Sequence, residues 1–231
     1  MPYFFYYFDP TMLIVLPALI FTLWAQMNVK NTYSKYSKIM TSRRMTGYNA
    51  ARQILDSNGL YDVRIDRVAG ELTDHYDPRE NVIRLSDAVY DSPSAAAVGV
   101  AAHEAGHAVQ YAKGYAPIKL RSAIIPVTRF GSIAAMPLFI IGMFAALPAL
   151  MYVGIAFYSL ALIFQLVTLP VEFNASKRAM EALQRSSILD DGELKASRKV
   201  LTAAALTYVA ALATSLLTIL RLLVLANGRR R

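Results

Sequence analysis

Residues 124–169 read IIPVTRFGSIAAMPLFIIGMFAALPALMYVGIAFYSLALIFQLVTL, an apolar stretch in which Arg129 is the single charged residue. A helix needs about 20 apolar residues to cross the hydrocarbon core of a bilayer, so this stretch is long enough for two crossings. Leu147-Pro148-Ala149 lies near its middle, and proline favours a turn there. We therefore expect a membrane-embedded helical hairpin that turns at these three residues on the outer side.

Two further apolar runs, residues 11–27 and 201–220, lie on either side of the hairpin. The flank before the first run is rich in Tyr and Phe and has no Lys or Arg. A secretory signal peptide needs a positive flank, so we expect this helix to be retained, with its aromatic residues at the membrane interface. Arg221 interrupts the last apolar region, and a basic tail follows at 227–231. These charges leave open whether the last segment fully spans.

The pattern predicts a mainly α-helical membrane protein with about four transmembrane helices. We expect five segments along the chain: an N-terminal transmembrane helix (1–29), a catalytic region (30–122), a transmembrane hairpin (123–171), a helical segment (172–199), and a C-terminal transmembrane helix with the tail (200–231). Both polar segments begin or end with Lys and Arg beside an apolar run. The positive-inside rule therefore places them in the cytoplasm, and the protein in the cytoplasmic (inner) membrane as a multi-pass protein.

Composition narrows the classes of function. Apolar residues make up 55% of the chain and charged residues only 17%, against about 25% in soluble domains. The net charge of +8 comes from basic residues that flank the apolar runs, so a lipid membrane is the expected partner and a nucleic acid is not. The chain has no cysteine, which excludes disulfides, thiolate metal sites and cysteine nucleophiles.

The polar region 30–122 predicts a small α+β unit. Apolar residues recur at helical spacing over 42–57, and short strands are expected near 61–65 and at 82–86, with a turn at 77–81 between them. A further helix is expected to begin at Ser92-Pro93 and to end at Ala112, before Gly114. The strand at 82–86 is either a purely structural strand or an open edge that pairs with a substrate backbone.

The helix that ends at Ala112 carries the motif His103-Glu104-Ala105-Gly106-His107, which is HExxH. The spacing of four residues puts both imidazoles on one face of the helix, where they can share a zinc ion. Glu104 then lies beside a zinc-bound water and can act as the general base, and later as the proton donor to the leaving amine. The neighbours of the motif are mostly small or apolar, which indicates a buried helix rather than two surface histidines.

Catalytic zinc normally has three protein ligands, so a third is needed. The main candidate is Glu172, a lone carboxylate that follows an apolar run on the same side of the membrane as the motif. Its alternative role is an interfacial ion pair with Lys177 or Arg178. His75 is the rival ligand, or else a donor to the oxyanion of the tetrahedral intermediate, or an ordinary solvated histidine.

A family resemblance adds to these inferences. Residues 74–78, 82–86, 102–110 and 170–176 resemble the YugP-type neutral zinc metallopeptidases of bacterial membranes, and the likeness extends over nearly the whole chain. More distantly the chain resembles the HtpX and CAAX prenyl-protease families, which combine HExxH with a downstream Glu-Phe-x-Ala-Asp segment. The resemblance implies a zincin-like, gluzincin-like site with Glu172 as third ligand. Ser176 departs from it, because those families have Asp at this position.

These observations predict a zinc-dependent metalloendopeptidase that hydrolyses peptide bonds of membrane or membrane-proximal proteins from the cytoplasmic side. One alternative is a non-catalytic metal-binding sensor or scaffold, which would not need the carboxylate of Glu104. Another is a metal-dependent hydrolase of a different bond, such as a lipid ester.

Overall fold

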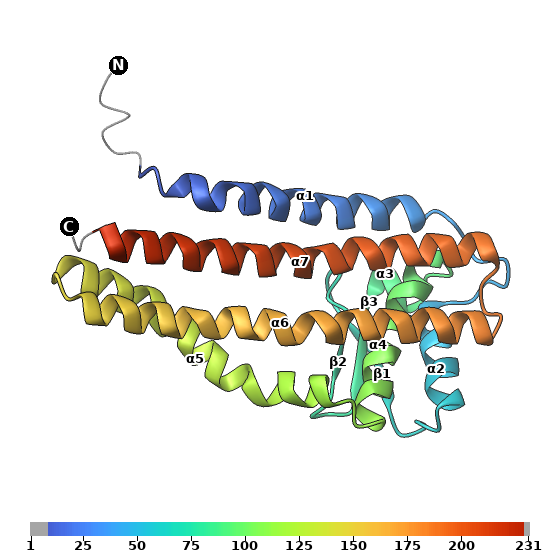
Figure 1. The fold of residues 1–231 in the computed structure, drawn as a ribbon. Helices are drawn as coiled ribbons and strands as arrows, with labels where there is room; N and C mark the ends of the chain where they lie inside the picture. The colour runs from blue at the N-terminus through green and yellow to red at the C-terminus, as the bar shows by residue number, and fades with distance from the viewer. Residues whose placement is uncertain (1–8, 229–231) are drawn as a thin grey trace, which may run out of the picture.

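The computed structural model describes residues 9–228, which form long helices and one small sheet (Figure 1). The expected aromatic anchor at the start of the chain and most of the basic tail fall in 1–8 and 229–231, outside the described residues. The elements are α1 (Met12–Tyr36), α2 (Gly47–Ser57), β1 (Arg64–Val68), β2 (His75–Asp77), β3 (Val82–Ser86), α3 (Asp87–Tyr90), α4 (Ala95–Ala112), α5 (Ala116–Phe144), α6 (Pro148–Arg185) and α7 (Asp191–Gly228).

Four of the described helices, α1, α5, α6 and α7, are long and apolar enough to cross a membrane, as the sequence predicts. Helices α5 and α6 form the expected hairpin and pack along each other. The connection occupies residues 145–147, slightly earlier than expected. Pro148 begins α6 instead of turning the chain, because proline fits the first turn of a helix, where no backbone N–H is needed.

Helix α6 continues without a break from the membrane span to Arg185. Its 38 residues extend about 57 Å at 1.5 Å per residue, whereas the hydrocarbon core is about 30 Å thick. Helix α6 is therefore nearly twice as long as the hydrocarbon core is thick. The segment that begins at Glu172 is a continuation of this helix and not a separate element.

Helix α7 is also continuous, and Arg221 does not interrupt it. The guanidinium of Arg221 forms an ion pair with Asp9 at 2.8 Å and donates to the hydroxyl of Thr11 at 3.1 Å. Helix α1 lies along α7, and the hydroxyls of Thr22 and Thr214 are hydrogen-bonded at 3.1 Å. Pairing of Arg221 lowers the cost of a charge near the end of a spanning helix.

The sheet has three strands in the order β1-β3-β2, with β1 parallel and β2 antiparallel to β3. The expected first strand begins later, at Arg64, and β2 was not expected from the sequence. The expectation of an open edge at 82–86 is wrong, because β3 has neighbours on both sides. The free edge near the HExxH helix belongs to β2.

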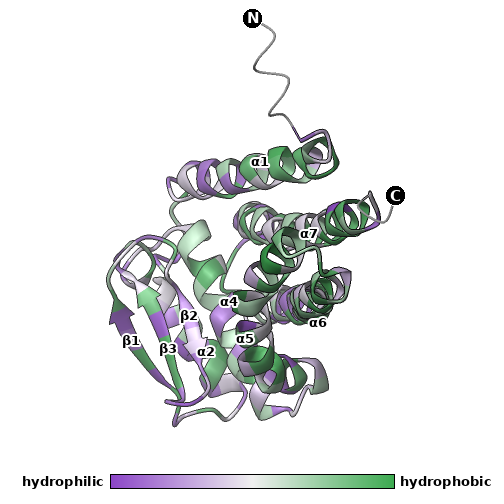
Figure 2. Ribbon diagram, turned by 90° about the vertical axis from the view of Figure 1, so that its left-hand side faces the viewer, coloured by the Kyte–Doolittle hydropathy of each residue, from purple (hydrophilic) through white to green (hydrophobic). Residues whose placement is uncertain are grey.

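Helix α4 lies between the sheet and the long helices (Figure 2). Its N-cap is Ser94 rather than the expected Ser92: the hydroxyl of Ser94 accepts from the backbone N–H of Ala97 at 3.2 Å. Two glycines permit its close approach to neighbouring helices. A Cβ on Gly106 would lie 2.7 Å from a backbone carbonyl oxygen of α6, and one on Gly99 would lie 3.0 Å from the Cβ of Ser197 on α7.

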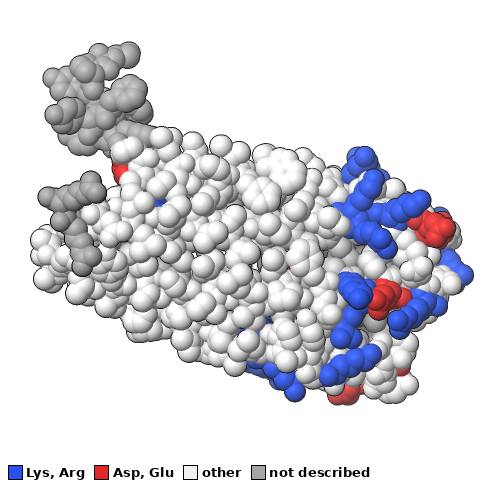
Figure 3. All heavy atoms as spheres, viewed as in Figure 1, with Lys and Arg blue, Asp and Glu red and all other residues white. Residues whose placement is uncertain are grey.

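The sheet and α2–α4 lie at one end of the long helices, and the described chain begins and ends at the opposite end (Figure 1). Lys and Arg gather at the end that carries the sheet, whereas the rest of the visible face is almost free of charge (Figure 3). This distribution is typical of a protein whose charged end lies outside the hydrocarbon core.

Candidate metal centre

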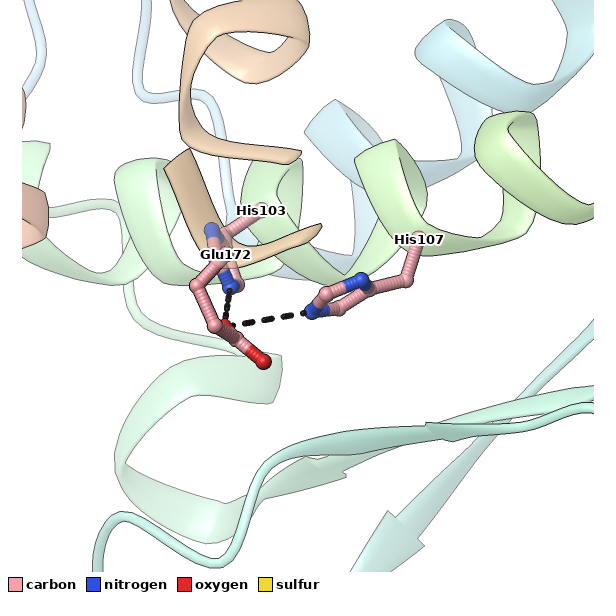
Figure 4. Close-up of side chains that lie close together, drawn as sticks. All are labelled: His103, His107 and Glu172. Carbon is pink, nitrogen blue, oxygen red and sulfur yellow. Dashed lines mark hydrogen bonds and ion pairs between the residues drawn. The ribbon is translucent and has the colours of Figure 1, made fainter. Parts of the chain in front are cut away.

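Three potential ligands converge between α4 and α6. His103 and His107 lie one turn apart on α4, and Glu172 reaches them from α6 (Figure 4). One ligand atom from each of the three lies within 4.8 Å of the others. Glu172 and His107 are buried, and the side chain of His103 is only 13% exposed.

The two distances from Glu172 to the imidazoles fit a single tetrahedral ion. With metal–ligand bonds of about 2.0–2.1 Å, neighbouring ligand atoms in a tetrahedral zinc site lie about 3.4 Å apart. Oε2 of Glu172 is 3.2 Å from Nε2 of His103 and 3.6 Å from Nε2 of His107. Two imidazoles and one carboxylate are also the donor set that zinc takes in hydrolytic sites, with a fourth position left for water. The residues present therefore fit zinc.

Hydrogen bonds orient both imidazoles with Nε2 toward the centre. Nδ1 of His107 is 3.0 Å from Oε1 of Gln110. The amide nitrogen of Gln110 donates to the carbonyl oxygen of Val171 at 2.8 Å and to Oδ1 of Asn174 at 3.0 Å. Because a carbonyl only accepts, Oε1 of Gln110 must be the acceptor and Nδ1 of His107 the donor. Nε2 of His107 then has its lone pair free for a metal.

Ser176 plays the corresponding part for His103. Its hydroxyl lies 3.1 Å from Nδ1 of His103, on the side of the ring away from Glu172. The residue at which the chain departs from the resembling families thus still contacts His103, one of the three candidate ligands. A serine hydroxyl accepts a hydrogen bond without adding a charge, whereas an aspartate at this position would add a negative charge.

Glu172 is held by α5 as well. The guanidinium of Arg121 donates to Oε1 of Glu172 at 3.2 Å, which leaves Oε2 for the imidazoles. The alternative of an ion pair with Lys177 or Arg178 is wrong: Lys177 pairs with Glu181 at 3.9 Å, and Arg178 donates to Asn174.

The electrostatics of the centre favour a cation. Burial lowers the pKa of His107, but the carboxylates of Glu172 and Glu104 outweigh burial and raise it overall. A buried imidazole that gains a proton so readily lies in a negative potential. A divalent cation neutralises the same potential.

Two cavities meet at this centre. Both are lined by the same five residues, Asp74, His103, Glu104, Glu172 and Tyr208. The sheet-side cavity encloses about 230 Å³ and is further lined by residues of β2, α4 and α5, among them His75, Tyr76, Tyr111, Arg121 and Ser122. The apolar cavity encloses about 220 Å³ and is further lined from α1, α4, α7 and the β1–β2 connection, by residues that include Val29, Leu72, Val100, Val200, Leu201 and Ala204.

Glu104 faces the point where the cavities join. It is 8% exposed and lines both of them beside His103. A carboxylate here reaches the volume in which a metal-bound water and a substrate carbonyl would meet. The arrangement can activate water for attack on a carbonyl.

His75 lies apart from the group of three. It is exposed on β2, and its Nδ1 is 2.8 Å from the carbonyl oxygen of Thr73. It belongs to the lining of the sheet-side cavity and is absent from the His–His–Glu group found in 9–228. The ligand alternative for His75 therefore has no support in the geometry.

Three residues that contribute to the site were not expected from the sequence. Tyr208 on α7 lines both cavities and interacts with Glu172. Asp74 accepts from the backbone N–H of Ser86 at 2.7 Å and from its hydroxyl at 3.1 Å, and burial raises the pKa of its carboxyl. Arg121 is the third. The sequence contained a hint for Tyr208 and Arg121, because a tyrosine inside an apolar run and an arginine beside one are candidates for function.

The HExxH motif on α4 lies beside a glutamate from the long apolar helix α6. This combination is typical of one class of protein, the membrane proteins that carry a site of the zinc-peptidase type. Residues 11–227 match the family described as "Putative neutral zinc metallopeptidase". The chain is also 47% identical over 217 residues to a protein of Bacillus subtilis (strain 168) named "Putative membrane protease YugP", with 94% of this chain and 96% of that protein covered. The chain belongs to this metallopeptidase family. No solved structure matches it.

Proposed function

We propose that the protein is a zinc metalloendopeptidase that cleaves membrane or membrane-proximal proteins at the cytoplasmic face of the inner membrane. The observation that carries the proposal is the cluster of His103, His107 and Glu172, with Glu104 beside it where two cavities join. Membership of a metallopeptidase family whose relative is named a membrane protease supports it.

The proposed roles follow from the contacts. His103, His107 and Glu172 hold the ion, which when bound supplies Lewis acidity and lowers the pKa of a water. Glu104 takes a proton from the attacking water and delivers it to the leaving amine. Gln110 fixes the tautomer of His107 through the hydrogen bonds described above.

Two side chains can donate to the oxyanion that forms on the substrate. His75 lines the sheet-side cavity from β2, and Tyr208 lines both cavities from α7. Tyr208 lies at the junction with Glu104, so we assign the principal donor role to it and an auxiliary one to His75. The Nδ1–H of a neutral His75 ring is already donated to the carbonyl oxygen of Thr73 at 2.8 Å.

The substrate backbone is expected to bind beside β2. This strand is the edge of the sheet, and His75 and Tyr76 of β2 line the sheet-side cavity. An extended segment that pairs with an edge strand gains backbone hydrogen bonds without any demand on sequence. Side-chain selectivity then has to come from the cavities.

Orientation follows from charge and helix length. The site lies at the end of the long helices where Lys and Arg gather (Figure 3). The positive-inside rule places that end in the cytoplasm. Glu172 lies on the part of α6 that leaves the bilayer, so the site is at the membrane surface and within reach of segments that emerge from the lipid.

The test uses the full chain, purified with zinc, and the Glu104→Gln variant as its matched control. We expect about one zinc per chain in both proteins and cleavage of an unstructured peptide mixture by the wild type only, with a loss of about 10²–10⁴-fold or more in the variant. Cleavage by Glu104→Gln at the rate of the wild type would refute the mechanism. Zinc-loaded wild type that cleaves no peptide would favour a metal-binding sensor, and cleavage of lipid esters instead of peptides would indicate a different hydrolase.

A further inference from the structure

The apolar cavity opens directly on the candidate metal centre. It is lined by His103, Glu104 and Glu172 as well as by its own aliphatic residues. A peptide whose carbonyl is attacked at this centre has to place the side chain next to the scissile bond in one of the two cavities. Their chemical character therefore limits which peptide bonds the site accepts, given the proposed function.

The two cavities differ in character. Helix α7 lines the apolar cavity with Val200, Leu201, Ala204 and Ala205, which lie on one face of the helix at spacings of one and four residues. Val29 of α1 adds to the aliphatic wall. Among the described residues that line this cavity, the ionisable side chains are Asp74, Tyr208 and three at the centre itself, His103, Glu104 and Glu172. The sheet-side cavity has in addition the guanidinium of Arg121.

The apolar cavity, of about 220 Å³, joins the sheet-side cavity at the centre. A substrate backbone that is extended beside β2 directs successive side chains to opposite sides, so one of them can enter the apolar cavity while the peptide carbonyl lies at the centre. The substrate segment is therefore unwound where it is cut.

Helices α1 and α7, which both contribute to the lining of the cavity, are long and apolar enough to cross a membrane. An apolar side chain that leaves the bilayer beside them passes from lipid into an aliphatic pocket and stays out of water. About 25 cal/mol per Å² of apolar surface favours this transfer over exposure to water. A carboxylate side chain would lose its hydration in the same pocket and would face the carboxyl group of Asp74.

We propose that the apolar cavity is the specificity pocket of the peptidase, which accepts a bulky aliphatic or aromatic side chain directly beside the scissile bond, with Ala204 in its wall. The substrate class is accordingly an unwound, membrane-proximal polypeptide segment that is cut next to such a residue.

The experiment starts from a peptide that the zinc-loaded full chain cleaves, with the cut located by mass spectrometry. Two series then vary the residue on either side of the cut among Gly, Ala, Leu, Phe and Glu. In one of the series we expect kcat/KM to be about 10–200-fold higher for Leu or Phe than for Ala, and lowest for Glu. The Ala204→Phe variant fills the pocket, so it should lose most of its kcat/KM for Leu and Phe and retain that for Ala and Gly.

Thr202→Phe is the matched control, because it adds a similar side chain to the same helix at an exposed position outside the cavity lining. It should keep the wild-type preference. The melting temperature and the zinc content show whether Ala204→Phe folds. If it does not, Ala204→Leu replaces it, because leucine fills less of the pocket. Dissociation constants of the same peptides for the inactive Glu104→Gln protein provide a readout that does not depend on turnover.

An equal loss for every peptide in folded Ala204→Phe would overturn the pocket assignment while leaving the proposed function intact. The same holds if the wild type shows no preference, or prefers Glu, in both series. If the zinc-loaded wild type cleaves no peptide, the proposed function fails and the pocket assignment fails with it.

Discussion

The hydrogen bonds of Gln110 allow one prediction to be worked out in detail. This side chain is fully buried and bridges His107 to Val171 and Asn174 on α6. Gln110→Leu removes the bridge and leaves the buried N–H of His107 without its acceptor, whereas Oδ1 of Asn174 keeps Arg178 as a donor. One buried polar group left unsatisfied costs about 1–3 kcal/mol, so we expect a loss of stability of this size.

The same substitution should weaken zinc binding. Loss of a hydrogen bond that orients a metal-bound histidine typically costs 10–100-fold in metal affinity, or about 1.4–2.7 kcal/mol. Competition with a chromophoric zinc chelator measures this affinity directly in the folded protein. Gln110→Glu is the control: its carboxylate still accepts from His107 but cannot donate to Val171.

We expect Gln110→Glu to retain most of the zinc affinity while its stability falls, which separates the two roles of the side chain. Zinc affinity in Gln110→Leu within twofold of the wild type would refute the reasoning that this residue fixes the tautomer of His107.

Four further predictions concern other parts of the site. Glu172→Ala should lower zinc content well below one per chain, and full retention of zinc would remove it from the ligand set. Tyr208→Phe should lower kcat by about 10²–10³-fold with zinc content unchanged if its hydroxyl stabilises the oxyanion, and an unchanged kcat would exclude that role. Gly106→Ala would place a Cβ 2.7 Å from a carbonyl oxygen of α6, so we expect a loss of about 1–3 kcal/mol in thermal unfolding, which an unaltered melting temperature would contradict. Burial raises the pKa of Asp74 above its ordinary 3.8, so the ionised carboxylate destabilises the folded state. The Asp74→Asn side chain can still accept from Ser86, so its melting temperature should rise relative to that of the wild type as the pH increases from about 4 to about 7. A difference in melting temperature that stays constant over this range would argue against the raised pKa.

Much of the fold could be predicted because apolar runs and the HExxH spacing are local signals. The four spans and the helix that carries His103 and His107 follow from periodicity and length alone. Strand β2 could not be predicted, because His75-Tyr76-Asp77 has no alternation of apolar residues and its conformation is set by pairing with β3.

The rest of the site depends on contacts between distant elements. The apolar run that contains the second half of the hairpin ends before Glu172, yet α6 continues because its polar part packs on α4. Arg121 and Tyr208 come from α5 and α7, and neither lies near the motif in sequence. Only the packing of these helices shows that both residues face Glu172.

The most direct test of the central claim is the anomalous scattering of zinc in crystals of the zinc-loaded Glu104→Gln protein. We predict a single zinc peak about 2.0–2.2 Å from Nε2 of His103, Nε2 of His107 and Oε2 of Glu172. A zinc peak elsewhere on the protein, or an ion held by His75 in place of Glu172, would contradict the account.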